Sequence, residues 1–137
     1  MRAQATVLNP GSVEAEAIVL DEELSFWGGF DPATGTILDI SHPQRGASLS
    51  GKVVVMPASR GSAGTPGALG ESLRIGTGPA GIVLLERDIN IAVGAMVVAS
   101  LYDSHCPVVV VNEGDYNTID AGDQVIISAD GVISTTS

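Results

Sequence analysis

Three apolar runs constrain this chain more than any other feature of its sequence. They are Val53–Met56, Ala80–Leu85 and Val108–Val111, and none of them contains a polar residue. A strand that is apolar on both faces must be covered on both faces, as strands of parallel sheets are. The segments between the runs predict helices at 66–75 and 90–102. The middle of the chain therefore predicts a β-α-β-α-β unit with parallel pairing and right-handed crossovers.

The two ends of the chain have a different pattern, which predicts antiparallel strands. Expected strands are residues 3–8, 14–20, 124–128 and 132–134, with a further short strand at 36–39. Asp130-Gly131 lies between the last two of the terminal strands and is a turn signal for a hairpin. We predict one domain spanning residues 1–137, of the α/β class. Its central parallel β-α-β-α-β unit is flanked by antiparallel strands, which makes a β/β/α domain.

The predicted ends of the first helix rest on specific residues. Pro66 suits the first turn, where a missing N–H costs nothing, and Thr65 before it is the expected N-cap. Gly76 and Gly78 are expected to end this helix near Ile75.

Charge limits the partners that this chain can have. The net charge is −10 and Lys and Arg together number only six, which argues against nucleic acid and against an anionic membrane surface. A small anionic substrate stays possible, because a site can be locally positive in an acidic protein. Charged residues make up 16%, below the usual value of about 25%. Either a partner covers part of the surface, or a Gly- and Ala-rich domain has a polar, uncharged surface.

Cysteine usage bears on the compartment and on metal binding. Cys106 is the one cysteine, so no internal disulfide can form and a cytoplasmic protein is the default expectation. The N-terminal residues have no apolar leader pattern, and no apolar run is long enough for a membrane span. Cys106 leads into a buried strand and is expected to be a core thiol. We expect no metal bound by this chain alone, because the histidines lack partners at ligand spacing.

The strongest candidate site is the loop at 58–65, between an expected strand and an expected helix. Such a loop brings backbone N–H groups and a helix N-terminus to one point, which favours anions. The loop follows the carboxyl end of an expected parallel strand, and ligands of open α/β sheets bind beyond the carboxyl ends of such strands. Gly61 and Gly64 would let the backbone approach a ligand, Ser62 would present its hydroxyl, and Arg60 could add charge. The alternative is a plain β–α connection with small residues for tight packing.

Three familiar motifs do not fit this loop. A phosphate-binding Walker loop ends in Gly-Lys-Ser/Thr, and the loop contains no lysine. The dinucleotide fingerprint needs a different spacing from that of Gly61, Gly64 and Gly67. A nucleophile elbow needs glycine two positions before the serine, where Arg60 stands before Gly61-Ser62.

A serine hydrolase would also need a base. The candidates are His42 and His105, with Asp103 near the latter. Because one residue separates Asp103 from His105, we expect that they cannot form the hydrogen bond of a triad. His42 precedes Pro43 and is expected to be a turn element, while His105 near a helix end would complement the helix dipole. Serine hydrolysis is therefore disfavoured.

Large aromatic residues gather in one loop, Phe26-Trp27-Gly28-Gly29-Phe30. If exposed, they would anchor an interface; otherwise they cap the end of the core. We favour the interface, because the shortage of charge already suggests a covered surface.

Several motifs together resemble the aconitase X swivel domain. They are residues 26–35, His42-Pro43, residues 51–57, Arg60-Gly61-Ser62, residues 80–83 and residues 92–95, within a resemblance running from about residue 11 to residue 132. The resemblance implies a swivelling β/β/α domain that closes over the active site of a large subunit. It also implies that the large subunit carries the iron–sulfur cluster, with no cofactor bound by this chain. A single Cys106 is consistent with that division.

The resemblance assigns a role to Ser62. It matches the family's catalytic serine, which acts as an alkoxide and general base before hydroxide leaves. Candidate substrate-binding neighbours are the loop residues Arg60, Gly61, Ala63, Gly64 and Thr65.

The resemblance also implies a substrate, a small hydroxy acid. The stretch 62–67 favours cis-3-hydroxy-L-proline, with mevalonate 5-phosphate, the substrate of phosphomevalonate dehydratases, as the alternative. A hypothesis of another class is a non-catalytic module that binds a small anion.

Overall fold

The computed structural model describes residues 1–60 and 64–137. Within these residues the chain forms an eight-stranded sheet and a two-stranded one. The strands are β1 (Arg2–Gln4), β2 (Thr6–Asn9), β3 (Val13–Val19), β4 (Phe30–Asp31), β5 (Thr36–Ile37), β6 (Val53–Met56), β7 (Gly81–Leu84), β8 (Val108–Val110), β9 (Gln124–Ile127) and β10 (Val132–Thr136). The helices are α1 (Thr65–Ile75), α2 (Ile89–Tyr102) and α3 (Glu113–Tyr116).

The large sheet has the strand order β1-β10-β9-β3-β6-β7-β8-β2. β6, β7 and β8 pair in parallel, and β3 joins them in parallel with β6. The outer pairs β1–β10, β10–β9, β9–β3 and β2–β8 are antiparallel. This arrangement confirms the expected parallel β-α-β-α-β centre. The flanks are antiparallel as expected, except that β3, which was expected to be antiparallel, pairs in parallel with β6 as well as antiparallel with β9.

The sheet curls because its two edge strands are neighbours in the sequence. β1 and β2 lie at opposite ends of the strand order, yet only Ala5 separates them. The Ala5 N–H still continues the pairing of β1 with β10, because it donates to the Gly131 carbonyl at 2.9 Å. The next residue, Thr6, pairs with Val110 of β8. The expectation of one strand over residues 3–8 was therefore wrong, because the chain changes its pairing partner at Ala5.

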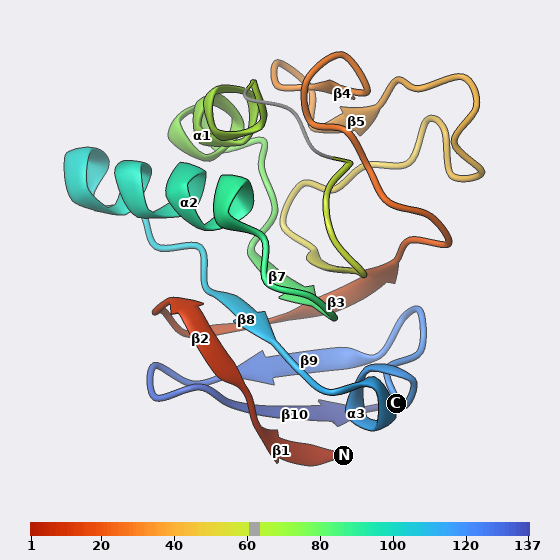
Figure 1. Cartoon of the computed structure of the whole chain (residues 1–137), viewed down its shortest axis with the longest axis vertical. Coiled ribbons are helices and arrows are strands. Elements are labelled where there is room, and N and C mark those ends of the chain that lie inside the picture. Colours follow the sequence, from red (N-terminus) through yellow and green to blue (C-terminus); the bar gives the residue numbers. More distant parts are fainter. Residues whose placement is uncertain (61–63) are drawn as a thin grey trace.

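Alternate residues of the central strands fill two separate cores. Val53 and Val55 point into the core within the curled sheet, while Val54 and Met56 point into the core beneath the helices. Figure 1 shows α1, α2 and the β4–β5 hairpin on one side of β3 and β7, with β9, β10 and β1 on the other side. This confirms that the apolar strands are covered on both faces.

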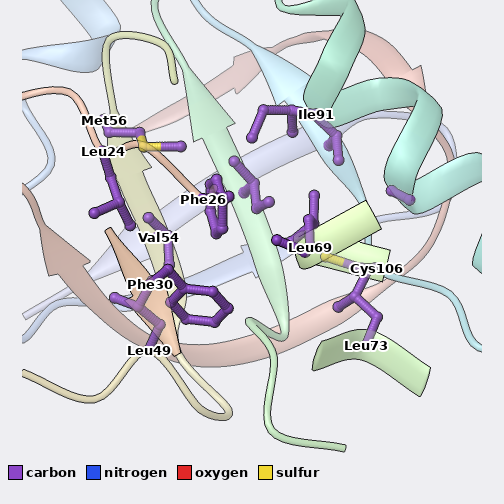
Figure 2. Packing of buried hydrophobic residues seen from close by; sticks show 14 of the residues in the cluster. Leu24, Phe26, Phe30, Leu49, Val54, Met56, Leu69, Leu73, Ile91 and Cys106 are labelled. Atoms are coloured by element: carbon purple, nitrogen blue, oxygen red, sulfur yellow. The ribbon is translucent and has the colours of Figure 1, made fainter. Parts of the chain in front are cut away.

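The aromatic loop divides between the core and the surface. Phe26 and Phe30 are buried in the helix-side core, with ring centroids 5.1 Å apart and an edge-to-face angle of 69° (Figure 2). Trp27 between them remains 67% exposed. The prediction of an interface loop was wrong for the two phenylalanines, because local sequence does not show which side of the loop faces the core.

The ends of α1 follow the sequence signals with one correction. Pro66 stands in the first turn as predicted, but the N-cap is Gly64 rather than Thr65. At the other end, Gly76 adopts φ +87°, a conformation that glycine tolerates without strain, and its N–H donates to the Ser72 carbonyl at 3.1 Å.

Candidate active-site loop

The candidate loop lies at the carboxyl edge of the parallel strands, as the sequence predicts. It leaves β6 after Met56 and enters α1 at Thr65. The candidates Gly61, Ser62 and Ala63 lie outside the described residues. The structure therefore describes the two ends of the loop, with Arg60 at one end and Gly64 and Thr65 at the other.

Backbone hydrogen bonds hold the first end of the loop between two other segments. The Pro57 carbonyl accepts from the N–H groups of Leu85 at 3.1 Å and Glu86 at 3.0 Å. On the opposite side, the Arg60 N–H donates to the Leu24 carbonyl at 2.9 Å. Residues 57–60 thus continue the sheet beyond β6, which gives the chain a fixed direction as it enters the loop.

Asp88 anchors the same segment and was missed by the sequence reasoning. Its side chain is buried at 9% exposure, just beyond β7. Oδ2 accepts hydrogen bonds from the Ser59 N–H at 2.7 Å and from the Ser59 hydroxyl at 2.5 Å. Oδ1 accepts from the Ile91 N–H at 3.1 Å, which makes Asp88 the N-cap of α2. One carboxylate therefore ties the candidate loop to the start of α2.

A signal for half of this role was present in the sequence. Aspartate directly before an apolar helical segment is a favoured N-cap, so the bond to Ile91 was predictable. The bond to Ser59 was not, because 29 residues separate the two side chains and only the fold brings them together.

Arg60 is exposed at this edge and lies near Asp39. Hydrogen bonds from Ser41 hold the pKa of the Asp39 carboxyl below its usual value, and the positive charge of Arg60 has a weaker effect in the same direction. In the described part of the chain Arg60 forms no ion pair within 4.0 Å. A substrate contact by Arg60 stays a prediction.

The position of Trp27 explains why residue 64 is a glycine. A Cβ built on Gly64 would lie 2.7 Å from two ring atoms of the Trp27 indole, closer than real contacts allow. Trp27 therefore lies directly against the second end of the candidate loop. This packing gives a reason for glycine besides the predicted approach to a ligand, which stays a prediction.

Thr65 is fully buried rather than exposed to solvent. Among the described residues its Oγ1 has no hydrogen-bond partner. An unpaired buried hydroxyl costs free energy, about 1–3 kcal/mol. A substrate contact by Thr65 stays a prediction.

His42 is a structural residue, as expected from the His–Pro turn. It is buried, and its Nδ1 accepts from the Gln44 N–H at 3.0 Å while Nε2 lies 3.2 Å from the Glu22 carbonyl. Because a carbonyl only accepts, these two bonds together suit a neutral ring with the proton on Nε2.

Asp103 and His105 do pair, contrary to expectation, with 2.9 Å between Oδ1 and Nε2. Asp103 adopts φ +51° at the end of α2, and this turn brings the two side chains together. The pair precedes β8, so it lies at the amino edge of the parallel strands. Arg60 and Gly64 lie at the other edge, which argues against a serine hydrolase triad.

Cys106 is a buried free thiol, which confirms the predicted core role. Burial raises its pKa to about 12, so it is neutral and unsuited to binding a metal. Across residues 1–60 and 64–137, no group of three or more His, Cys, Asp or Glu side chains could hold a metal ion. In the same part of the chain, no helix has the length and apolar composition to cross a membrane.

Comparison with known proteins accounts for nearly all of the chain. The sequence pattern of the aconitase X swivel domain matches residues 2–135. The chain belongs to the aconitase X swivel domain family. This swivel domain is also similar to a solved structure, aconitase X of Thermococcus kodakaraensis in its holo form. That match has a TM-score of 0.87 at 28% identity, and it covers 100% of this chain and 99% of the other.

Curated relatives of the swivel domain have two different names. A cis-3-hydroxy-L-proline dehydratase of Hypocrea jecorina is 33% identical over 125 residues, which are 91% of this chain and 21% of the dehydratase. A phosphomevalonate dehydratase small subunit of Methanopyrus kandleri is 45% identical over 84 residues, which are 61% of this chain and 62% of that subunit. The swivel domain therefore spans about a fifth of the first relative and less than two thirds of the second.

Proposed function

We propose that this chain is one swivel domain over residues 1–137 and the small subunit of an aconitase-X-type dehydratase. It would supply Ser62 to an active site shared with a large subunit. The observation that carries the proposal is the loop joining β6 to α1, held at the carboxyl edge by Asp88 and Ser59. Membership of the swivel domain family supports the same assignment.

The proposed reaction is removal of water from a small hydroxy acid. The Ser62 alkoxide takes a proton from carbon, the C–H electron pair forms a carbon–carbon double bond, and the hydroxyl on the neighbouring carbon leaves. α1 begins three residues after Ser62 and has no acidic residue in its first turn. A helix N-terminus favours negative charge nearby, so this arrangement would help to keep the serine oxygen ionised.

The rest of the site would belong to the partner. The described residues offer no ligand set for an iron–sulfur cluster, since Cys106 is a single buried thiol at the other edge of the sheet. A cluster would therefore reside in the large subunit. The exposed charge of Arg60 would meet the substrate carboxylate.

cis-3-Hydroxy-L-proline is the first candidate substrate. The 33% identity to a hydroxyproline dehydratase extends over 91% of this chain and supports it. Mevalonate 5-phosphate is the second candidate, favoured by the 45% identity to a phosphomevalonate dehydratase small subunit over a shorter stretch.

The test combines this chain with the large aconitase-X-type subunit of the same organism. Loss of a general base lowers kcat by about 10²–10⁴-fold, so Ser62→Ala should lose activity to this extent while still assembling. Ser12→Ala is the control, because Ser12 is exposed and precedes β3 at the opposite edge. A fully active Ser62→Ala complex, or dehydration by this chain alone, would refute the proposal.

Substrate choice is tested on the same complex with both compounds. A higher kcat/KM for mevalonate 5-phosphate would reverse the ranking. A stable homo-oligomer that binds anions and catalyses nothing would favour the non-catalytic module instead.

A further inference from the structure

Helix α2 has an apolar composition that its buried face does not require. Its fourteen residues include no charged side chain. Ile91, Ala95 and Val98 point inward and complete the helix-side core. The outer side is apolar too, although it is exposed, and comprises Ile89, Val93, Met96, Val97 and Leu101. Tyr102 lies in line with Ile91 and Val98 and is exposed because it ends the helix. A surface helix normally carries polar residues on its outer side, so this pattern is typical of a helix covered on both sides.

A groove extends this exposed face toward α1. It has a volume of about 310 Å³ and is lined by Gly67, Gly70 and Gly94 together with apolar residues of α2. The two helices approach closely at Gly94, where an added Cβ would lie only 3.1 Å from the Pro66 backbone. The Glu71–Arg74 ion pair, 2.6 Å between Oε1 and Nη2, borders the groove.

The exposed α2 residues and this groove are called the α2 surface below. Figure 1 shows α2 beside α1 at the margin of the molecule. Contiguous apolar surface of this kind marks an interaction site in most proteins. Interface centres are poor in charge and rich in Met and aromatic residues, as the α2 surface is, and grooves accept anchoring side chains.

Charge and the length of a relative indicate which partner covers the α2 surface. A second copy would bring another net charge of −10, and like charges of this size oppose self-association. In the hydroxyproline dehydratase of Hypocrea jecorina, the matching domain is only 21% of the chain. A much larger polypeptide therefore accompanies the swivel domain there.

We propose that the α2 surface is a docking site for the large subunit, an inference that rests on the proposed function. An apolar side chain of the large subunit would fill the groove between α1 and α2. The groove begins at Pro66 and Gly67, directly after the candidate loop, and runs toward Arg74 and Tyr102. Docking here would hold the start of α1, with Gly64 and Thr65, in a fixed orientation toward the partner's part of the active site.

The test measures binding of the large subunit to two charged variants, Leu101→Glu and Met96→Glu. Leu101 is 67% exposed and Met96 is 50% exposed, so both variants should keep the native fold and melting temperature. Each should weaken binding at least about tenfold, as loss of an interface anchor does. Ile126→Glu is the matched control, since Ile126 is an exposed apolar residue on β9, across the sheet, and binding should stay unchanged.

Sedimentation of the isolated chain and activity of the complex complete the test. Wild-type affinity in both folded variants overturns the inference, as does self-association of the wild type that Leu101→Glu abolishes. At saturating large subunit, Leu101→Glu should recover kcat, which Ser62→Ala cannot do. An active Ser62→Ala complex would refute the proposed serine role while leaving the docking site intact. Failure of the wild type to bind the large subunit refutes both.

Discussion

Replacing Asp88 with asparagine should loosen the attachment of the candidate loop to α2. The carboxylate accepts three hydrogen bonds, two from Ser59 and one from the Ile91 N–H. An amide has a single oxygen, which can face either Ser59 or Ile91. The amide nitrogen would then face the backbone N–H of the other residue, and two donors cannot form a hydrogen bond. At least one of the native bonds is therefore lost, and a buried N–H is left unpaired.

The size of this effect follows from the burial and the charge of the carboxylate. A hydrogen bond to a charged group contributes about 1.5–3 kcal/mol, against about 0.5–1.5 kcal/mol for a neutral pair. One lost bond and two weakened ones should lower the free energy of unfolding by about 2–4 kcal/mol. For a chain of 137 residues this is a fall of roughly 10 °C in Tm.

Urea unfolding followed by circular dichroism measures the change. Asp120→Asn is the control, because Asp120 is exposed and its carboxyl accepts no hydrogen bond within the described residues; it should stay within about 0.5 kcal/mol of wild type. Ser59→Ala removes only the hydroxyl bond to the carboxylate and should cost about 1.5–3 kcal/mol. If Asp88→Asn is no less stable than Asp120→Asn, the anchoring role of Asp88 is refuted.

Four further predictions concern the aromatic loop and the buried thiol. Gly64→Ala should shift the emission of Trp27, the one tryptophan, while Gly67→Ala, with open space around its Cβ, should leave the emission unchanged. Phe26→Ala should cost about 3–5 kcal/mol and Trp27→Ala under about 1, measured by urea unfolding; equal costs would contradict the assigned burial. Cys106 should resist a thiol reagent until the chain unfolds, and rapid native labelling would contradict its burial. Burial raises the pKa of the Cys106 thiol to about 12, while the unfolded thiol ionises near pH 8.5. The stability that Cys106 contributes should therefore fall as pH rises between these two values. Comparing the unfolding of wild type and Cys106→Ala at each pH measures this fall.

Much of the fold could be predicted from the sequence, because it depends on local patterns. Apolar runs predicted strands covered on both faces, and alternate residues of Val53–Met56 do enter two cores. Pro66 and Gly76 marked the two ends of α1, because each residue acts on the backbone within one helical turn. The place of the candidate loop, at the carboxyl edge of β6, follows from the same β–α order.

The remaining features depended on contacts between distant residues. Ser59 meets Asp88 across 29 residues, and the change of partner at Ala5 depends on the curl of the whole sheet. The apolar sequence of α2 does not show which side faces inward, since all of its sides look alike until the helix packs. Short-range periodicity determines which elements form. Long-range packing decides which polar groups pair, which face is buried and which is left exposed.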